Sequence, residues 1–158
     1  RYNPMSYHNG AVWPHDNAMI ALGFARYGYR EEAAKIFTGL FDASLFLDLR
    51  RMPELFCGFL KRKGEGPTLY PLACAPQAWS STVVFALLQA CLGMEISNTP
   101  QPQITFCNPY LPPWLNSLEI KKLTIGNSSV DISIERHAND AGINVLKREG
   151  NIKVTVVK

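Results

Sequence analysis

The fold is decided by the stretch Asp16-Asn17-Ala18-Met19-Ile20-Ala21-Leu22-Gly23-Phe24-Ala25-Arg26-Tyr27-Gly28. Asp16 is a residue type that caps helix N-termini, and Gly28 is a residue type that often ends helices. Between these two positions the side chains are apolar nearly all round a helical projection. A helix that is apolar on every side is buried on every side. We therefore expect residues 17–27 to form a helix inside a larger helical assembly.

Two further runs continue the helical pattern. Residues 31–47 predict an amphipathic helix, because apolar residues fall at helical spacing and charged residues lie on the other faces. Residues 76–93 are again apolar, with Pro76 in the first turn and Gly93 at the end. Buried helices that alternate with an amphipathic helix are typical of a fold with an inner and an outer ring of helices. Three helices cannot bury two all-apolar members, so we expect a parent chain or a partner subunit to supply the missing surface.

Beyond residue 103 the hydrophobic period changes from helical to two. Apolar and polar residues alternate over 130–135, which predicts a strand with one solvent-exposed face. Gly126-Asn127 joins this strand to another over 118–125, and Gly150-Asn151 lies between a second pair of strands. The chain thus divides into helices over 1–95, a polar, proline-containing linker over 96–103, and a small antiparallel β extension over 104–158.

The composition is that of a globular protein, with 47% hydrophobic residues, 18% charged residues and a net charge of +3. This mild charge argues against a nucleic-acid partner. No apolar run suits a membrane span or a signal peptide, and the chain opens without methionine, which indicates a piece of a longer parent. The cysteines have no zinc-site spacing and favour a reducing, cytoplasmic compartment, although two disulfides stay open: Cys57, Cys74, Cys91 and Cys107.

The segment 6–17 (Ser-Tyr-His-Asn-Gly-Ala-Val-Trp-Pro-His-Asp-Asn) is the most informative for function. It combines aromatic rings, a carboxylate and amides in a loop before an apolar helix. Sugars present flat C–H faces and a ring of hydroxyls, so they need aromatic platforms beside planar hydrogen-bonding groups. The competing interpretation is purely structural, with Asp16 as an N-cap, Trp13 as a core residue and Asn9-Gly10 as a turn.

Glu54 stands among apolar and aromatic neighbours in the segment 51–59. Desolvation in such a setting raises the pKa of a carboxyl group toward the range useful for proton transfer. The alternative is a surface ion pair between Glu54 and Arg50 or Arg51. A third segment, 70–80, places Gln77 and Trp79 at the start of an apolar helix, where they could touch a ligand or, for the tryptophan, belong to the core.

Three motifs together resemble the closing part of bacterial amylo-α-1,6-glucosidase (glycogen debranching) proteins. They are residues 6–17, Pro-Glu-Leu-Phe-Cys-Gly-Phe (53–59) and Tyr-Pro-Leu-Ala-Cys-Ala-Pro-Gln-Ala-Trp-Ser (70–80), in the order and spacing of that family. Residues 107–135 resemble its carboxy-terminal extension. The resemblance implies a mainly α fold, the C-terminal portion of an (α/α)6 toroid of the six-hairpin glycosidase type, followed by a small antiparallel β unit.

The resemblance also implies a glycoside hydrolase that acts on α-glucosidic linkages by an inverting mechanism with two carboxylates. Glu54 is then the general base, and the general acid lies in the missing amino-terminal part. The isolated chain would lack hydrolase activity. The mechanism needs no metal and no cofactor. The residues assigned to substrate binding are Tyr7, His8, Gly10, Trp13, His15, Asp16, Gln77 and Trp79.

Other functions stay open at this point. The same family clan includes trehalase-, rhamnosidase- and glucosylglycerate-cleaving specificities. A non-catalytic carbohydrate-binding or interaction module would be folded and would bind maltodextrin unaided. The expected partners are an α-glucan or oligosaccharide, the rest of the parent chain, and further copies of the chain through exposed apolar helices. We expect neither nucleic acid nor a membrane as a partner.

Overall fold

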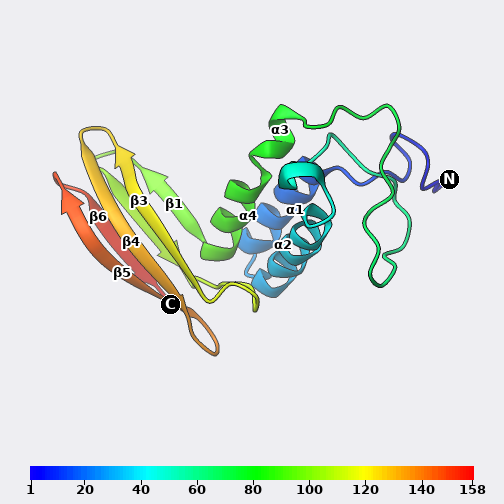
Figure 1. Ribbon diagram of the computed structural model, residues 1–158. Helices are drawn as coiled ribbons and strands as arrows, with labels where there is room; N and C mark the ends of the chain where they lie inside the picture. The colour runs from blue at the N-terminus through cyan, green and yellow to red at the C-terminus, as the bar shows by residue number, and fades with distance from the viewer.

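The computed structural model describes residues 1–158 and contains helices and strands in equal measure, 28% of the residues each. All helices lie before residue 93 and all strands after it (Figure 1). The expected mainly α fold is therefore wrong, and the chain does not form a portion of an (α/α)6 toroid. The expectation failed because the third apolar run is broken into two short helices, and because two more strands form than the sequence pattern indicated.

The first helix, α1 (Pro14–Arg26), begins earlier than expected. Pro14 occupies its first turn, and the N-cap residue is Trp13, whose side chain makes no capping hydrogen bond. Asp16 lies inside the first turn, where its negative charge suits the helix dipole. The interpretation of Asp16 as an N-cap is thus wrong, because proline favours the first helical position and moves the start upstream.

The second helix, α2 (Arg30–Ser44), is amphipathic as expected and buries Ala33, Ala34, Phe37 and Leu40. A short 3-10 turn, η1 (Asp48–Arg50), follows it. The third apolar run forms two helices, α3 (Ala78–Ser81) and α4 (Val83–Leu92). Gly93 ends α4 with a φ of 54°, which suits glycine because a Cβ there would lie 2.2 Å from the Cys107 carbonyl oxygen. No helix is both long and apolar enough to span a bilayer.

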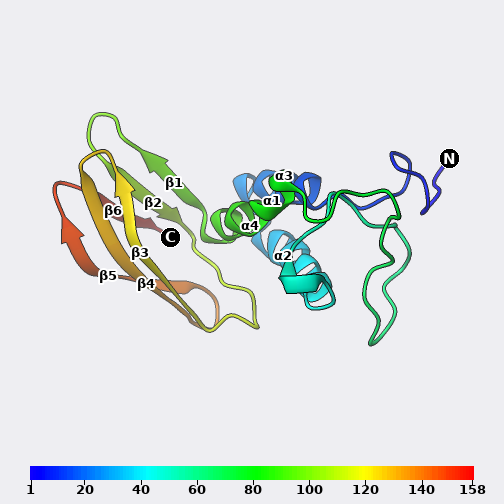
Figure 2. The ribbon, with the colours of Figure 1, turned by 45° about the horizontal axis from the view of Figure 1, so that its top comes forward.

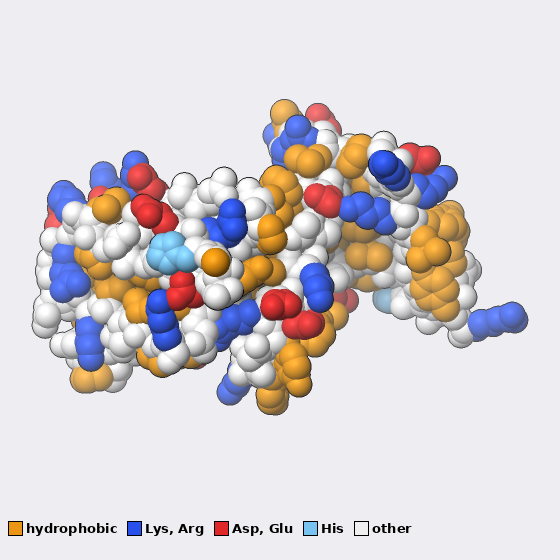
Figure 3. All heavy atoms as spheres, turned by 90° about the horizontal axis from the view of Figure 1, so that it is seen from below, with side chains coloured by type: hydrophobic (Ala, Val, Ile, Leu, Met, Phe, Trp, Pro, Cys, Tyr) orange, Lys and Arg blue, Asp and Glu red, His pale blue; other side chains and the backbone are white.

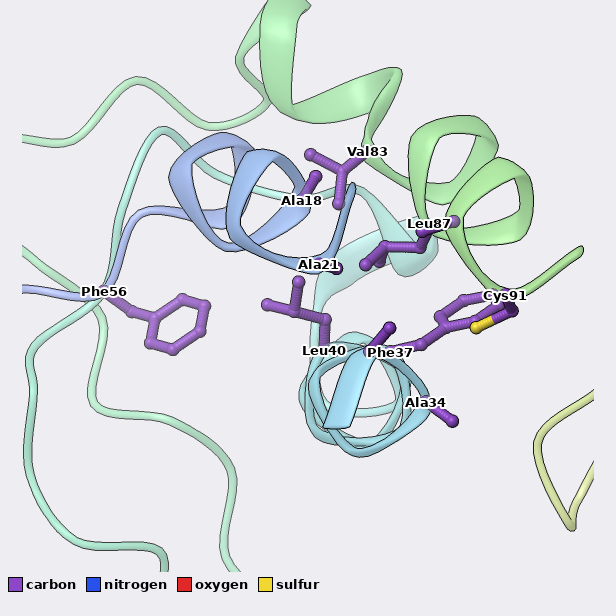
Figure 4. Close-up of a cluster of buried hydrophobic side chains, with 11 residues drawn as sticks. Ala18, Ala21, Ala34, Phe37, Leu40, Phe56, Val83, Leu87 and Cys91 are labelled. Atoms are coloured by element: carbon purple, nitrogen blue, oxygen red, sulfur yellow. The ribbon is translucent and has the colours of Figure 1, made fainter. Parts of the chain in front are cut away.

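A first hydrophobic core lies among α1, α2 and α4 (Figure 4). Small residues of α1 contact the larger side chains Phe37, Leu40 and Leu87. Burial of α1 is one-sided, because only Pro14, Ala18 and Ala21 are buried, whereas Met19 is 69% exposed. The prediction that α1 is buried on every side is wrong for residues 1–158, because two neighbouring helices can cover only one side of it.

Six strands form two three-stranded sheets that face each other (Figure 2). One sheet has the order β1 (Met94–Ser97), β2 (Gln103–Cys107), β6 (Lys153–Val157). The other has the order β3 (Ser117–Ile125), β4 (Ser128–Arg136), β5 (Ala141–Glu149). The second core lies between them and includes Ile104, Phe106, Ile132 and Ile134.

The two predicted turns differ in what they connect. Gly126-Asn127 joins β3 and β4 as an antiparallel hairpin, as expected. Gly150-Asn151 instead connects β5 to β6 across the two sheets, and β6 pairs in parallel with β2. The β unit is therefore not wholly antiparallel. The proline-containing stretch 96–103 covers the end of β1, the turn that follows it and the start of β2.

A tryptophan attaches the strands to the helices. The Trp114 ring stacks on Phe41 with ring centroids 4.0 Å apart, and its Nε1–H donates a 3.0 Å hydrogen bond to Thr38 Oγ1. Nearby, the Tyr110 N–H donates to the Cys91 carbonyl, and the Arg30 guanidinium donates to the Asn108 carbonyl. The 107–115 segment thus holds the sheets against α2 and α4.

Candidate active site

The three segments singled out in the sequence meet in space. Val12 and Phe56 exchange two backbone hydrogen bonds of 2.8 and 3.0 Å, and Phe56 also pairs with Leu69. The Gln77 N–H donates to the Met52 carbonyl at 3.2 Å. These bonds connect the 6–17, 51–59 and 70–80 segments side by side, although they are far apart in the sequence.

Two glycines allow this close approach. A Cβ at Gly10 would lie 2.1 Å from the Asn3 carbonyl oxygen, and a Cβ at Gly58 would lie 1.8 Å from the Gly10 carbonyl oxygen. Neither position has room for any other residue. Gly10, which the sequence analysis assigned to substrate binding, is therefore required for the close backbone contact that closes the 3–11 loop.

Glu54 is the central polar group of the site and is 9% exposed. Its Oε1 accepts a 2.5 Å hydrogen bond from the Tyr7 hydroxyl, and its Oε2 accepts a 3.2 Å hydrogen bond from the Cys74 N–H. Neither Arg50 nor Arg51 pairs with it, so the surface ion pair considered from the sequence does not form. Each carboxylate oxygen has one protein donor and keeps capacity to accept a further hydrogen bond.

The pKa of the Glu54 carboxyl lies below its usual value. The hydrogen bond from Tyr7 lowers it most, the Cys74 N–H lowers it further, and the charge of His15 adds to the effect, while burial opposes all three. The sequence-based prediction of a raised pKa is therefore wrong, because the donors stabilise the anion more than burial destabilises it. The same contact raises the pKa of Tyr7 to about 12. Glu54 is accordingly an ionised carboxylate at neutral pH.

Aromatic rings surround Tyr7, the side chain that donates to Glu54. The Tyr7 ring makes edge contacts with His8, Trp13 and Tyr70, at centroid distances of 4.8, 4.7 and 5.7 Å. Trp13 Nε1–H donates a 3.2 Å hydrogen bond to the Tyr7 carbonyl. The Asn17 side chain donates to the Trp13 carbonyl at 2.9 Å. These contacts fix the Tyr7 side chain, and with it the direction of its hydroxyl.

His15 and Trp79 form a second aromatic pair beside Trp13. Their rings stack with centroids 4.3 Å apart, and Trp79 is 49% exposed. His15 Nε2 lies 3.1 Å from Asp16 Oδ1, so Asp16 orients the imidazole. Trp79 thus presents an open ring face at the surface, which is a suitable platform for the C–H face of a sugar.

Three buried or half-buried polar groups of the site have no hydrogen-bonding partner for their side chains. His15 Nδ1 and Ser80 Oγ are buried without a partner. The side chain of Gln77 makes no hydrogen bond within the protein, and only its backbone is bonded. Buried polar atoms are rarely left unpaired, but His15 Nδ1 and Ser80 Oγ have almost no accessible surface. Of the three groups, the half-buried Gln77 side chain is the one that a polar ligand can reach.

Two contributors to the site were not assigned from the sequence. Tyr70 contacts Tyr7, and the Cys74 backbone binds Glu54. Both lie within the 70–80 motif, but nothing in the sequence pairs them with residues some 20 to 63 positions away. All four cysteines are free thiols. No three His, Cys, Asp or Glu side chains lie together as metal ligands.

No protein-family model matches this chain, and no curated protein shows significant similarity to it. The resemblance to glycogen-debranching proteins therefore stays a prediction that rests on the three motifs. Any function proposed for the chain therefore rests on these motifs and on the geometry around Glu54.

Proposed function

We propose that the chain carries one part of a glycoside hydrolase site, the part that contains the general base. Glu54 is this base, and the substrate contains an α-glucosidic linkage. The observation that supports this most is the ionised Glu54 carboxylate, held by Tyr7 and Cys74 among aromatic rings. A general base must be deprotonated at the working pH, and Glu54 meets that requirement.

In this mechanism Glu54 removes a proton from the water that attacks the anomeric carbon. Because Tyr7 occupies one position on Oε1 and the Cys74 N–H one on Oε2, the remaining lone pairs are available to that water. Trp79 and Trp13 provide the apolar surfaces against which a glucose ring packs. His8, His15, Asp16 and Gln77 border the same region and supply polar groups for its hydroxyls.

An inverting glycosidase needs a second carboxyl group about 6.5–9.5 Å from the base to protonate the leaving oxygen. No Asp or Glu is among the groups that perturb the pKa of Glu54, and Asp16 pairs with His15. The proposal therefore assigns the acid to a residue outside 1–158. The same observation favours a second candidate, a non-catalytic sugar-binding module that uses Glu54 to bind a hydroxyl.

The test compares glucose release from a branched limit dextrin by residues 1–158 and by a longer polypeptide that contains them. We expect release by the longer polypeptide only, and a loss of about 10²–10⁴-fold in its rate on Glu54→Gln. Glu95→Gln is the matched control, because Glu95 is exposed on β1 and forms no ion pair. Full activity of the Glu54→Gln variant would exclude Glu54 as the base.

The two candidates are separated by binding measurements on residues 1–158. Isomaltose and maltotriose are titrated while tryptophan fluorescence is recorded, because Trp13 and Trp79 lie at the site. Saturable binding without hydrolysis by any polypeptide that contains the chain would favour the sugar-binding module. Trehalose and rhamnosides, tested in the same way, distinguish the alternative specificities.

A further inference from the structure

A cavity of about 290 Å³ lies between α2 and the 56–68 loop. Its lining shares Val12, Asn17, Phe56 and Cys57 with the segments that build the site described above, but it includes none of Tyr7, Glu54 and Trp79, so the two adjoin without sharing those side chains. Figure 3 views the molecule from below, and hydrophobic side chains there lie directly beside Lys, Arg, Asp and Glu side chains. The apolar wall of the cavity is mainly formed by Ile36, Leu40, Phe46, Phe56, Phe59 and Leu60.

A glycine in the middle of α2 contributes to the lining. Gly39 lies well inside the helix, where glycine is the least favourable residue after proline. A Cβ built on Gly39 meets no atom within 4 Å. Close packing against another part of the chain is therefore not the reason for a glycine at position 39. The open space of the cavity extends to the backbone of α2 at this residue. A flat ring could lie there between the α2 backbone and the phenylalanines.

The polar residues of the cavity form two exposed ion pairs. Lys61 Nζ lies 2.6 Å from Asp42 Oδ2, and Arg62 Nε lies 2.9 Å from Glu65 Oε2. Arg62 uses only its Nε in this contact, so both terminal Nη groups keep their donors free. A guanidinium with free Nη groups binds a carboxylate through two parallel hydrogen bonds. Exposed ion pairs of this kind contribute little to stability and can exchange partners.

We propose that this cavity binds a small aromatic carboxylate, with the ring over Gly39 and the carboxylate on Arg62. The volume of about 290 Å³ lies just below the roughly 300–1,000 Å³ typical of small-molecule sites, which suits one ring on a short chain rather than a nucleotide. Three phenylalanines and a bare helix backbone match a flat ring. The proposal does not depend on the reaction assigned to Glu54.

The probe is 3-phenylpropionate, titrated into ¹⁵N-labelled residues 1–158 while amide shifts are recorded by NMR. We expect saturable shifts centred on α2 and the 56–68 loop, and contacts from the probe ring to Ile36 and Phe56 side-chain protons. Phenethylamine, which has a similar ring and the opposite charge, should bind about tenfold more weakly or worse. Arg62→Gln should weaken binding of 3-phenylpropionate by about the same factor.

Gly39→Leu fills the cavity and should abolish binding. Gly23→Leu is its matched control, because Gly23 is also a glycine inside a helix with open space around it, but lies outside the cavity. Gly39→Ala verifies that the helix tolerates a side chain there. Absence of saturable shifts in the wild-type chain would overturn the proposal. So would unchanged binding by Gly39→Leu, or equal affinity for phenethylamine, which would remove the carboxylate from the ligand class.

Discussion

The Tyr7 hydroxyl donates a 2.5 Å hydrogen bond to Glu54 Oε1, although the two residues are 47 positions apart. The Tyr7 ring is in turn fixed by edge contacts with Trp13 and Tyr70. The 6–17 segment therefore orients the carboxylate and makes the largest contribution to lowering its pKa. In the proposed hydrolase site, Tyr7 positions the base, while Trp79 is the more accessible residue for contact with a sugar.

Tyr7→Phe should raise the pKa of Glu54 back toward its ordinary value of 4.5, because the largest cause of its depression is removed. A carboxyl with a depressed folded-state pKa stabilises the fold above its unfolded-state pKa, and this stabilisation is lost as pH falls through the folded-state value. The variant should therefore lose less stability on acidification than the wild type. Carboxyl ¹³C NMR measures the pKa directly.

The control for this substitution is Tyr29→Phe, because Tyr29 is exposed and its hydroxyl makes no hydrogen bond. Its effect on the Glu54 titration should be negligible. An unchanged Glu54 pKa in Tyr7→Phe would show that the Cys74 N–H and the charge of His15 depress it without Tyr7. Where hydrolysis is measured in a longer polypeptide, Tyr7→Phe should also move the acid limb of the rate profile to higher pH.

Glu54→Gln should lower the pKa of Tyr7 from about 12 toward 10, because the carboxylate is the first cause of the rise. A group with a raised folded-state pKa stabilises the fold below its unfolded-state pKa, and this contribution disappears as pH rises from about 10 through about 12. Tyrosinate absorbance during alkaline titration reports the change. Six tyrosines contribute to this signal, so the difference from Tyr7→Phe isolates the one in question.

Trp114→Ala should destabilise the chain by about 3 kcal/mol, the lower end for loss of a large aromatic side chain, because Trp114 is only partly buried. It loses the stacking on Phe41 and the hydrogen bond to Thr38. Trp114→Phe keeps a ring and should cost about 1 kcal/mol, the value of the hydrogen bond. Urea unfolding monitored by circular dichroism measures both, and equal stabilities of the two variants would contradict this account.

Thiol reagents should distinguish the cysteines by position. Cys74 is exposed and should react first, whereas Cys91 is buried and its pKa is raised to about 12 by burial. Only about one Cys91 in ten thousand would be a thiolate at pH 8, so it should react only after unfolding. Stopped-flow measurements with an aromatic disulfide, compared with Cys74→Ser, test the order. A fast phase that persists in Cys74→Ser would assign the reactive thiol elsewhere.

The periodic segments were the parts of the fold best predicted from sequence. The amphipathic pattern of 31–47 located α2 to within a few residues, and Gly126-Asn127 located the β3–β4 turn. The mainly α toroid was wrong, because apolar runs such as 76–93 indicate burial rather than the length of a helix. The parallel pairing of β6 with β2 was missed, because a glycine-asparagine turn does not reveal that the chain changes sheets.

The fold brings together segments that the sequence had singled out, but the sequence did not predict the electrostatics around Glu54. Tyr7, Trp13, Glu54 and Trp79 were singled out because aromatic and polar residues cluster around them. The direction of the Glu54 pKa shift was wrong, because the apolar neighbours of Glu54 are visible in the sequence and the Tyr7 and Cys74 donors are not. Tyr70 and Cys74 were missed for the same reason.

The sequence by itself determined the local structure of this protein. Pro14 marks the start of α1, and Gly28 and Gly93 lie where α1 and α4 end. The alternation of apolar and polar residues over 130–135 produces β4. These preferences act between residues only a few positions apart, so the local sequence is enough to set them. Only the tertiary structure decided that the pKa of Glu54 lies below its usual value, that Gly39 opens onto a cavity and that the six strands divide into two sheets. These properties depend on which distant segments pack together, and the free energy of that packing is a sum over contacts that no single stretch of sequence contains.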